Sequence, residues 1–223
     1  MKEPWNRQLY IDAFGSLRNE QLAGPMEAYM KHHFPFLGIK SPQRKEALKS
    51  YFSTYAVPDK PQLLEEVWEI YKMPEREYQY AAIALLSKKQ KSLTIEDLAF
   101  CAKLITEKSW WDCVDSIAPS IVGDIVKKDR NNGEQIMLQW SDSSNMWLNR
   151  AAILHQLKYK AETNKQLLKD IILKHTDSKE FFIQKAIGWV LREYAKTDPS
   201  FVKHFVGVND LKPLSKREAL KHF

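Results

Sequence analysis

Glycine and cysteine are both scarce in this chain, and each scarcity argues against a class of site. Seven of the 223 residues are glycine, and neither a glycine-rich phosphate-binding loop nor a G-x-S-x-G nucleophile turn occurs. The two cysteines, Cys101 and Cys113, have neither metal-ligand spacing nor the pattern of a disulfide framework, so we expect a reducing, cytoplasmic location. His32 and His33 are adjacent and cannot share a helix face, which makes them a poor metal pair. We therefore expect no metal ion and no cofactor.

Long apolar runs are absent as well. No segment approaches the length of a transmembrane helix, and Met1–Arg7 carry no apolar signal segment, so we expect no membrane association. The net charge of +6 suits a polyanionic partner, although a modest excess of lysine also serves solubility. A hydrophobic share of 44% over 223 residues is enough to bury a substantial core.

The sequence does contain a nearly continuous series of helical patterns. Prolines, Pro25 among them, are expected to break the first sixty residues into short helices. Thr94 with Asp97 is typical of a helix start, Pro119 is expected to kink a helix or begin one, and Asp129–Gly133 favours a turn. The later predicted helices cover about residues 43–55, 61–71, 75–89, 94–108, 109–118, 119–129, 134–141, 144–159, 163–175, 179–196, 199–206 and 215–222.

The most informative stretch runs from Ser109 to Ala118. Ser109 followed three residues later by Asp112 predicts a helix that begins at Ser109 with a capping box. Trp111 and Asp115 are spaced i, i+4, so they lie together on a side away from the expected core face. A structural interpretation is equally open here, with a half-buried Trp and an Asp in a salt bridge. The expected core face comprises Trp110, Cys113, Val114 and Ile117.

A period of 35 residues underlies the helices. Similar four-residue blocks recur at this spacing, and a last block follows after 32 residues. Repeats of this length with two or three helices are typical of α-solenoids, and the tetratricopeptide consensus is absent. We therefore predict an all-α, HEAT-like solenoid of about six helical repeats, forming a single domain over residues 1–223 with a concave basic groove. The first residues of the blocks are Lys45, Tyr80, Asp115, Arg150, Lys185 and Arg217.

Stacking of the repeats would align these first residues in one row, with four cations around a single carboxylate. Arg150 falls on an apparently apolar stripe, where a buried arginine is costly unless it meets solvent, Asp115 or a phosphate. Trp189 lies off the core face of its helix together with Lys185 and Arg192. Aromatic side chains interleaved with cations favour a nucleic-acid surface, although Trp189 packed against the next repeat is the alternative.

Four segments of the chain resemble the AlkD-type DNA alkylation-repair glycosylases. The likeness extends from about residue 25 to the C-terminus. Its motifs are long and ungapped, which makes the resemblance specific. The segments cover residues 29–34, 109–117, 147–160 and 179–194.

The resemblance implies a monomeric enzyme of base excision repair that binds double-stranded DNA in its groove. It would hydrolyse the N-glycosidic bond of cationic N3- or N7-alkylated purines such as 3-methyladenine and 7-methylguanine. It further implies that Asp115 is the catalytic carboxylate and that Trp111 and Trp189 are aromatic walls beside the lesion. It assigns DNA contacts to Arg150, Tyr29 and Lys158, and the cationic row and its neighbours add Lys45, Lys185, Arg192 and Arg217.

The residue types suit this chemistry independently of the resemblance. An alkylated purine already carries a positive charge and leaves without a general acid, and a carboxylate stabilises the oxocarbenium-like sugar that remains. Two other classes stay open. One is a non-catalytic HEAT-like scaffold that binds DNA or an acidic protein through the same groove, and the other is a protein-interaction solenoid without a nucleic-acid role.

Overall fold

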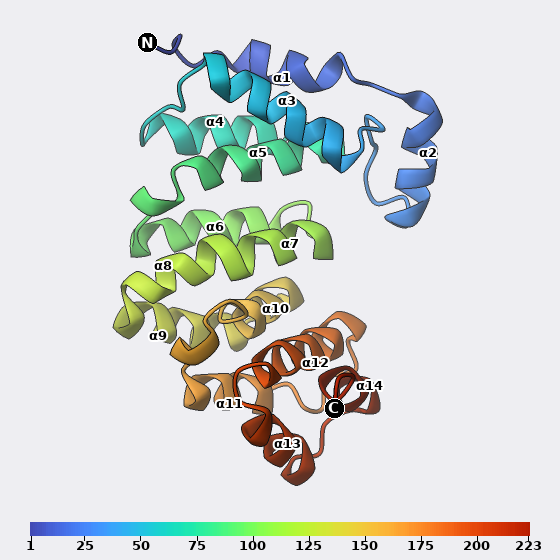
Figure 1. Cartoon of the computed structure of the whole chain (residues 1–223), viewed down its shortest axis with the longest axis vertical. Coiled ribbons are helices and arrows are strands. Elements are labelled where there is room, and N and C mark those ends of the chain that lie inside the picture. The colour runs from blue at the N-terminus through green and yellow to red at the C-terminus, as the bar shows by residue number, and fades with distance from the viewer. The chain divides into compact units, whose positions relative to one another are not determined.

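The computed structural model describes all 223 residues, and its regular secondary structure is helical (Figure 1). The one β-type contact is an isolated bridge between Glu3 and Tyr55. The all-α prediction is therefore confirmed. None of the helices is both long and apolar enough to span a membrane.

The helices group into two compact units, Met1–Ser92 and Leu93–Phe223. The single domain over residues 1–223 and its concave groove stay predictions. The first unit contains α1 (Arg7–Gly15), α2 (Glu20–Tyr29), α3 (Ser41–Thr54), α4 (Gln62–Tyr71) and α5 (Arg76–Lys88). The second contains α6 (Leu98–Thr106), α7 (Trp111–Ile117), α8 (Gly123–Lys128), α9 (Arg130–Ser141), α10 (Met146–Leu154), α11 (Lys165–Leu173), α12 (Phe181–Ala195), α13 (Pro199–Val208) and α14 (Pro213–Ala219).

Aromatic side chains form much of the core of the first unit. Tyr10 of α1 is fully buried, its ring centroid lies 4.8 Å from that of Tyr51, and its hydroxyl donates to the carbonyl of Ala81 at 2.9 Å. The buried Glu77 carboxylate accepts three backbone N–H groups from the segment that leads into α3, at 2.8–2.9 Å. A buried carboxylate is tolerated here because these donors satisfy it. The segment is Leu37–Ile39.

The 35-residue period has a direct structural counterpart. Gln79, Asn149 and Gln184 stand at equivalent positions of their repeats. Each amide nitrogen donates to at least one backbone carbonyl at the end of the preceding helix or in the turn after it. The Asn149 Nδ2 donates to the carbonyls of Trp140 and Ser141 at 2.9 and 3.1 Å. The repeated amide therefore closes the same helix-to-helix turn in separate repeats.

Several helix boundaries differ from the prediction. The capping box at Ser109 is wrong, because the Ser109 hydroxyl donates to the carbonyl of Ile105 at 2.8 Å and finishes the preceding helix. α7 begins at Trp111, with Trp110 in extended conformation before it. Pro25 lies inside α2 rather than ending it. By contrast, the cap at Thr94 is confirmed, since its backbone N–H donates to Asp97 at 2.7 Å.

The helix break predicted at Asp129–Gly133 is confirmed, because α8 ends at Lys128 and α9 begins at Arg130, but it is confined to Asp129. Asp129 caps α9 by accepting the backbone N–H of Asn132 at 3.3 Å, and the rest of the run is helical. Gly133 permits this because α8 and α9 touch there, and a Cβ at this position would lie 2.9 Å from the Cα of Val126. The turn signal came from residues that cap and pack a helix junction.

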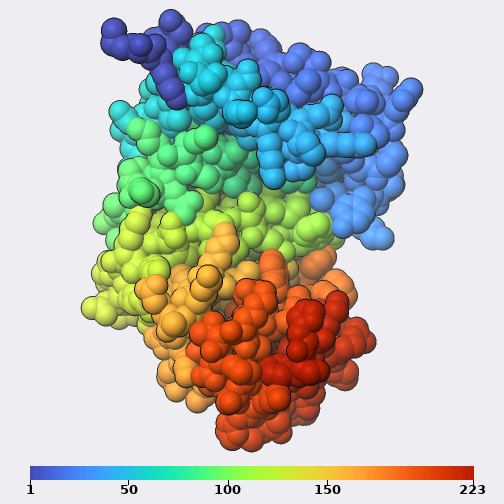
Figure 2. Space-filling view, in the orientation of Figure 1, coloured from blue at the N-terminus to red at the C-terminus, as the bar shows by residue number.

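α14 lies directly on α12, as the dark red and orange surfaces show in Figure 2. The contact centres on Gly188, where a Cβ would come within 2.4 Å of the Glu218 Cβ and 3.0 Å of the Ser215 carbonyl oxygen. The Ser215 hydroxyl donates to the carbonyl of Gln184 at 2.9 Å. A glycine is needed at 188 because the two helices leave no room for a methyl group.

We expect Gly188→Ala to destabilise the protein by about 1–3 kcal/mol, because the methyl group forces α14 away from α12. Gly207→Ala is the matched control, since Gly207 is also helical but a Cβ added there would have no atom within 4 Å. That control is expected to be neutral or to stabilise by up to about 1 kcal/mol. Thermal unfolding of both variants measures the difference, and equal melting temperatures would contradict the close approach at Gly188.

Candidate active site

Helix α7 presents Asp115 on the side opposite its core contacts. Cys113, Val114 and Ile117 are buried, which orients the helix as its apolar pattern predicts. Trp111 and Asp115 are both partly buried, and the Asp115 side chain is 17% exposed. The carboxylate is thus shielded yet still reachable from solvent.

Asp115 and Arg150 form a bidentate ion pair. The Arg150 Nε donates to Oδ1 and Nη2 donates to Oδ2, both at 2.8 Å. The remaining terminal nitrogen, Nη1, donates to the backbone carbonyl of Phe182 at the start of α12. Arg150 itself is 4% exposed, and such burial is tolerated because its donors are satisfied by a carboxylate and a carbonyl. One guanidinium therefore bonds α10 to both α7 and α12.

Two opposing influences set the acidity of Asp115. Burial disfavours the charged form and raises the pKa of Asp115 above its ordinary value. The hydrogen bonds and positive charge of Arg150 act in the opposite direction, but they do not fully offset burial. The Arg150 guanidinium thus favours the charged form of the carboxylate against the effect of burial.

Three aromatic rings pack together next to the ion pair. The centroids of Trp110 and Trp147 are 5.8 Å apart, and Phe182 lies 5.1 Å from each of them. The Phe182 ring is also 5.9 Å from the guanidinium carbon of Arg150. We did not predict this cluster from the sequence, which pointed to Trp110 only as a core residue. The spacing of Trp147 three residues before Arg150 is the signal that could have revealed it.

A π-helical turn, Ala118–Val122, follows α7 and contains Pro119, so the chain continues into α8 without a break. Such turns leave backbone groups that need other partners. The Tyr159 hydroxyl donates to the carbonyl of Gly123 at 2.6 Å, and Lys158 donates to the Ser120 hydroxyl at 2.8 Å. These two hydrogen bonds thus join the segment after α10 to the turn that follows the Asp115 helix.

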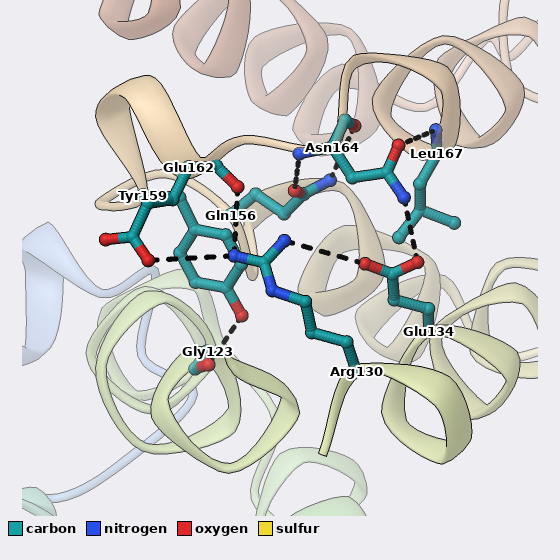
Figure 3. A network of polar contacts seen from close by, with 8 residues as sticks. All are labelled: Gly123, Arg130, Glu134, Gln156, Tyr159, Glu162, Asn164 and Leu167. Atoms are coloured by element: carbon teal, nitrogen blue, oxygen red, sulfur yellow. Dashed lines mark hydrogen bonds and ion pairs between the residues drawn. The ribbon is translucent and has the colours of Figure 1, made fainter. Parts of the chain in front are cut away.

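The hydrogen bond from Tyr159 to Gly123 belongs to the polar network in Figure 3. Arg130 lies with its guanidinium carbon 5.3 Å from the Tyr159 ring and donates to the Glu162 carbonyl at 3.0 Å. Glu134, which also lies beside Arg130, accepts a hydrogen bond from the Asn164 amide at 2.8 Å. Burial raises the pKa of Tyr159, so its hydroxyl remains a donor at neutral pH. The network fixes the segment that carries Lys158.

Two of the predicted DNA-binding cations are held by an acid that we did not predict. Lys185 lies 2.9 Å from one oxygen of Glu218, and the Arg192 Nη1 lies 2.5 Å from the other. Glu218 directly follows Arg217 in the last repeat block, one position outside the predicted row. Arg217 itself is exposed.

The other predicted residues are placed as follows. Trp189 is partly buried on α12, and Lys158 is exposed. In the first unit, Tyr29 at the end of α2 is 69% exposed and Lys45 on α3 is exposed. Within the second unit the structure brings Asp115 and Arg150 into contact; the DNA-binding roles stay predictions.

The second unit also contains a cavity of about 370 Å³. Its lining includes Gln156, Lys160 and Tyr194 but none of the predicted site residues. No group of three or more His, Cys, Asp or Glu side chains is arranged to hold a metal ion.

Comparisons with known proteins agree with the resemblance. A family model described as DNA alkylation repair enzyme matches residues 10–223. A solved structure described as a predicted DNA alkylation repair enzyme from Enterococcus faecalis is 37% identical, with a TM-score of 0.83, and the match covers 92% of this chain and 96% of that one. No curated protein matches this chain.

Two more distant structures share the fold. AlkD2 from Streptococcus mutans is 21% identical with a TM-score of 0.61, over 81% of this chain and 88% of its own. The protein smu.31 from Streptococcus mutans UA159 is 19% identical with a TM-score of 0.61, over 91% of this chain and 98% of its own. These confirm the helical-repeat architecture. Because the family model spans residues 10–223 and the Enterococcus structure matches along nearly its whole length, this chain belongs to the DNA alkylation repair enzyme family.

Proposed function

We propose that this protein is a monofunctional DNA glycosylase that excises cationic N3- or N7-alkylated purines from duplex DNA, as the first step of base excision repair. The observation that carries the proposal is the ion pair of Asp115 with Arg150, a shielded but accessible carboxylate in a chain of this family. No metal or cofactor takes part in the proposed reaction.

The substrate supplies much of the driving force. Alkylation at N3 or N7 gives the purine a positive charge, so the base departs as a neutral leaving group without protonation by the enzyme. Bond cleavage leaves an oxocarbenium-like sugar, the species that carboxylates stabilise in glycoside hydrolysis. An ionised Asp115 near the anomeric carbon would stabilise that charge and orient the attacking water.

Arg150 does not occupy all the hydrogen-bond acceptor sites of the Asp115 carboxylate. A carboxylate has about four lone-pair sites, and the bidentate pair occupies one on each oxygen. The 17% exposure of the Asp115 side chain leaves a path to the remaining sites. In this proposal Arg150 keeps Asp115 ionised and oriented, and the free lone pairs face the sugar and the water.

The aromatic and cationic residues complete the proposed site. Trp111 and Trp189 would flank the lesion, where an indole face attracts a cation with about 0.5–2 kcal/mol. Phosphates would be bound by exposed or partly exposed cations of each unit, and in the first unit also by Tyr29, through contacts that depend on salt. The proposed phosphate-binding cations are Lys45, Lys158, Lys185, Arg192 and Arg217. Arg150 is not among them, because it is buried and its guanidinium is engaged by Asp115 and the Phe182 carbonyl.

A non-catalytic DNA-binding scaffold is the second candidate, and one observation favours it. Asp115 already has a partner in Arg150, which is also what a purely structural salt bridge would require. The two functions differ in excision, because a scaffold would bind duplex DNA without releasing any base.

Asp115→Asn is expected to lower single-turnover excision of 7-methylguanine from duplex DNA by roughly 10²-fold, because it removes the charge that stabilises the transition state. Duplex binding should change little. Asp112→Asn is the matched control, since it removes the same charge from the first turn of the same helix. Equal rates for wild type and Asp115→Asn would leave Asp115 as a structural partner of Arg150.

Arg150→Lys is expected to move the acid limb of the pH–rate profile to higher pH. Burial raises the pKa of Asp115 and Arg150 lowers it, so weakening the bidentate pair raises that pKa further. The active, ionised form is then lost at a higher pH as the solution is acidified. An acid limb at the wild-type pH in this variant would show that Arg150 does not set the charge of Asp115.

The proposed mechanism requires a damaged base that already carries a positive charge. Duplexes with 3-methyladenine or 7-methylguanine are expected to lose the base, and duplexes with uracil are not, because no acid in the proposed site protonates a neutral leaving base. The product is expected to be an intact abasic strand, since water rather than a lysine attacks the sugar. Efficient uracil release, or a covalent complex trapped by borohydride, would contradict this mechanism.

A further inference from the structure

The helix α12 carries Lys185, Gly188 and Arg192 on one face, at spacings of three and four residues. Glu218 of α14 lies above the middle position. Its Cβ would be 2.4 Å from a Cβ at residue 188, so the absence of a side chain on glycine is what allows the acid to reach this place. The carboxylate is thereby set between a cation one turn before it and a cation one turn after it.

The contacts divide the carboxylate between the two cations. Lys185 lies 2.9 Å from Oε1 and Arg192 lies 2.5 Å from Oε2. Arg192 is further held by the backbone carbonyl of Glu218, 3.2 Å from its Nη1. The side chain of Lys185 is 38% exposed, whereas that of Arg192 is 22% exposed. Lys185 can therefore leave the Glu218 carboxylate for another partner, whereas Arg192 remains bound to it.

We propose that Glu218 sets the affinity of this protein for DNA by competing with a backbone phosphate for Lys185. The inference rests on the proposed DNA binding by α12. In the free protein the acid reduces the local charge of the two cations from +2 to +1. A phosphate that binds Lys185 must first displace the Glu218 carboxylate from it. The free energy lost with that ion pair weakens DNA binding by the same amount.

The competition holds over the whole physiological pH range. Lys185, and after it Arg192, lower the pKa of Glu218 to about 2, so the carboxylate is ionised at neutral pH. A substitution that removes the Glu218 carboxylate therefore removes one negative charge at neutral pH.

Fluorescence anisotropy with an undamaged duplex tests the proposal, because it measures binding without excision. Glu218→Gln is expected to bind about two- to fivefold more tightly than wild type at low salt, the equivalent of one partly exposed ion pair. The dependence of log affinity on log salt should become steeper, by about 0.9 for one added phosphate contact. Adding Lys185→Gln to this variant should abolish the gain.

Asp198→Asn is the matched control. Asp198 pairs with Lys165 at 2.6 Å and caps α13, and asparagine retains the cap while removing the same unit of charge. A gain confined to Glu218→Gln supports local competition, whereas an equal gain in both variants would show a general effect of net charge and overturn the proposal. If Glu218→Gln does not fold, Glu218→Asp retains the charge, withdraws it by one methylene, and should give a smaller gain in the same direction.

The remaining outcomes separate this inference from the proposed function. Wild type that binds duplex DNA, with no gain or a loss in the Glu218 variants, would overturn the competition and leave the glycosylase proposal intact. Duplex binding by neither wild type nor Glu218→Gln would overturn both.

Discussion

The hydrogen-bonded pair of Asp115 and Arg150 is the interaction on which the second unit most depends. Arg150 is 4% exposed and is bonded to α7 through Asp115 and to α12 through the carbonyl of Phe182. Breaking a buried pair of this kind typically costs about 3–5 kcal/mol, because one charge is left without a partner. The same contact orients the carboxylate and offsets the effect of burial on its pKa. The same ion pair is therefore needed both by the fold of the second unit and by the proposed chemistry.

The fold was largely predictable from periodicity. The 35-residue spacing identified equivalent positions, and the helical patterns identified nearly every helix, because both report which residues must be buried. The boundaries were less predictable where a polar residue had two possible uses. Ser109 bonds backward to Ile105 instead of capping α7. The break expected over Asp129–Gly133 is confined to Asp129, which caps α9. Such choices depend on tertiary packing, as at Gly133 against Val126.

The site was predictable to the extent that contacts follow the repeat. Asp115 and Arg150 are one period apart, and their pairing was one of the partners expected for a buried arginine. Glu218 was missed because the last block follows after 32 residues, so the period did not indicate what lies over Gly188. The aromatic cluster was missed although Trp147 and Phe182 are one period apart, because that spacing marks equivalent positions and does not show that the two rings meet.

The central claim is that Arg150 acts on excision through Asp115. A double-mutant cycle of Asp115→Asn and Arg150→Lys tests it most directly, with single-turnover release of 7-methylguanine from saturating duplex as the measurement. The account predicts that the double variant is no slower than Asp115→Asn alone, since Arg150 has no remaining carboxylate charge to maintain. Rate losses that multiply in the double variant would show that the two residues act independently, and would contradict the account.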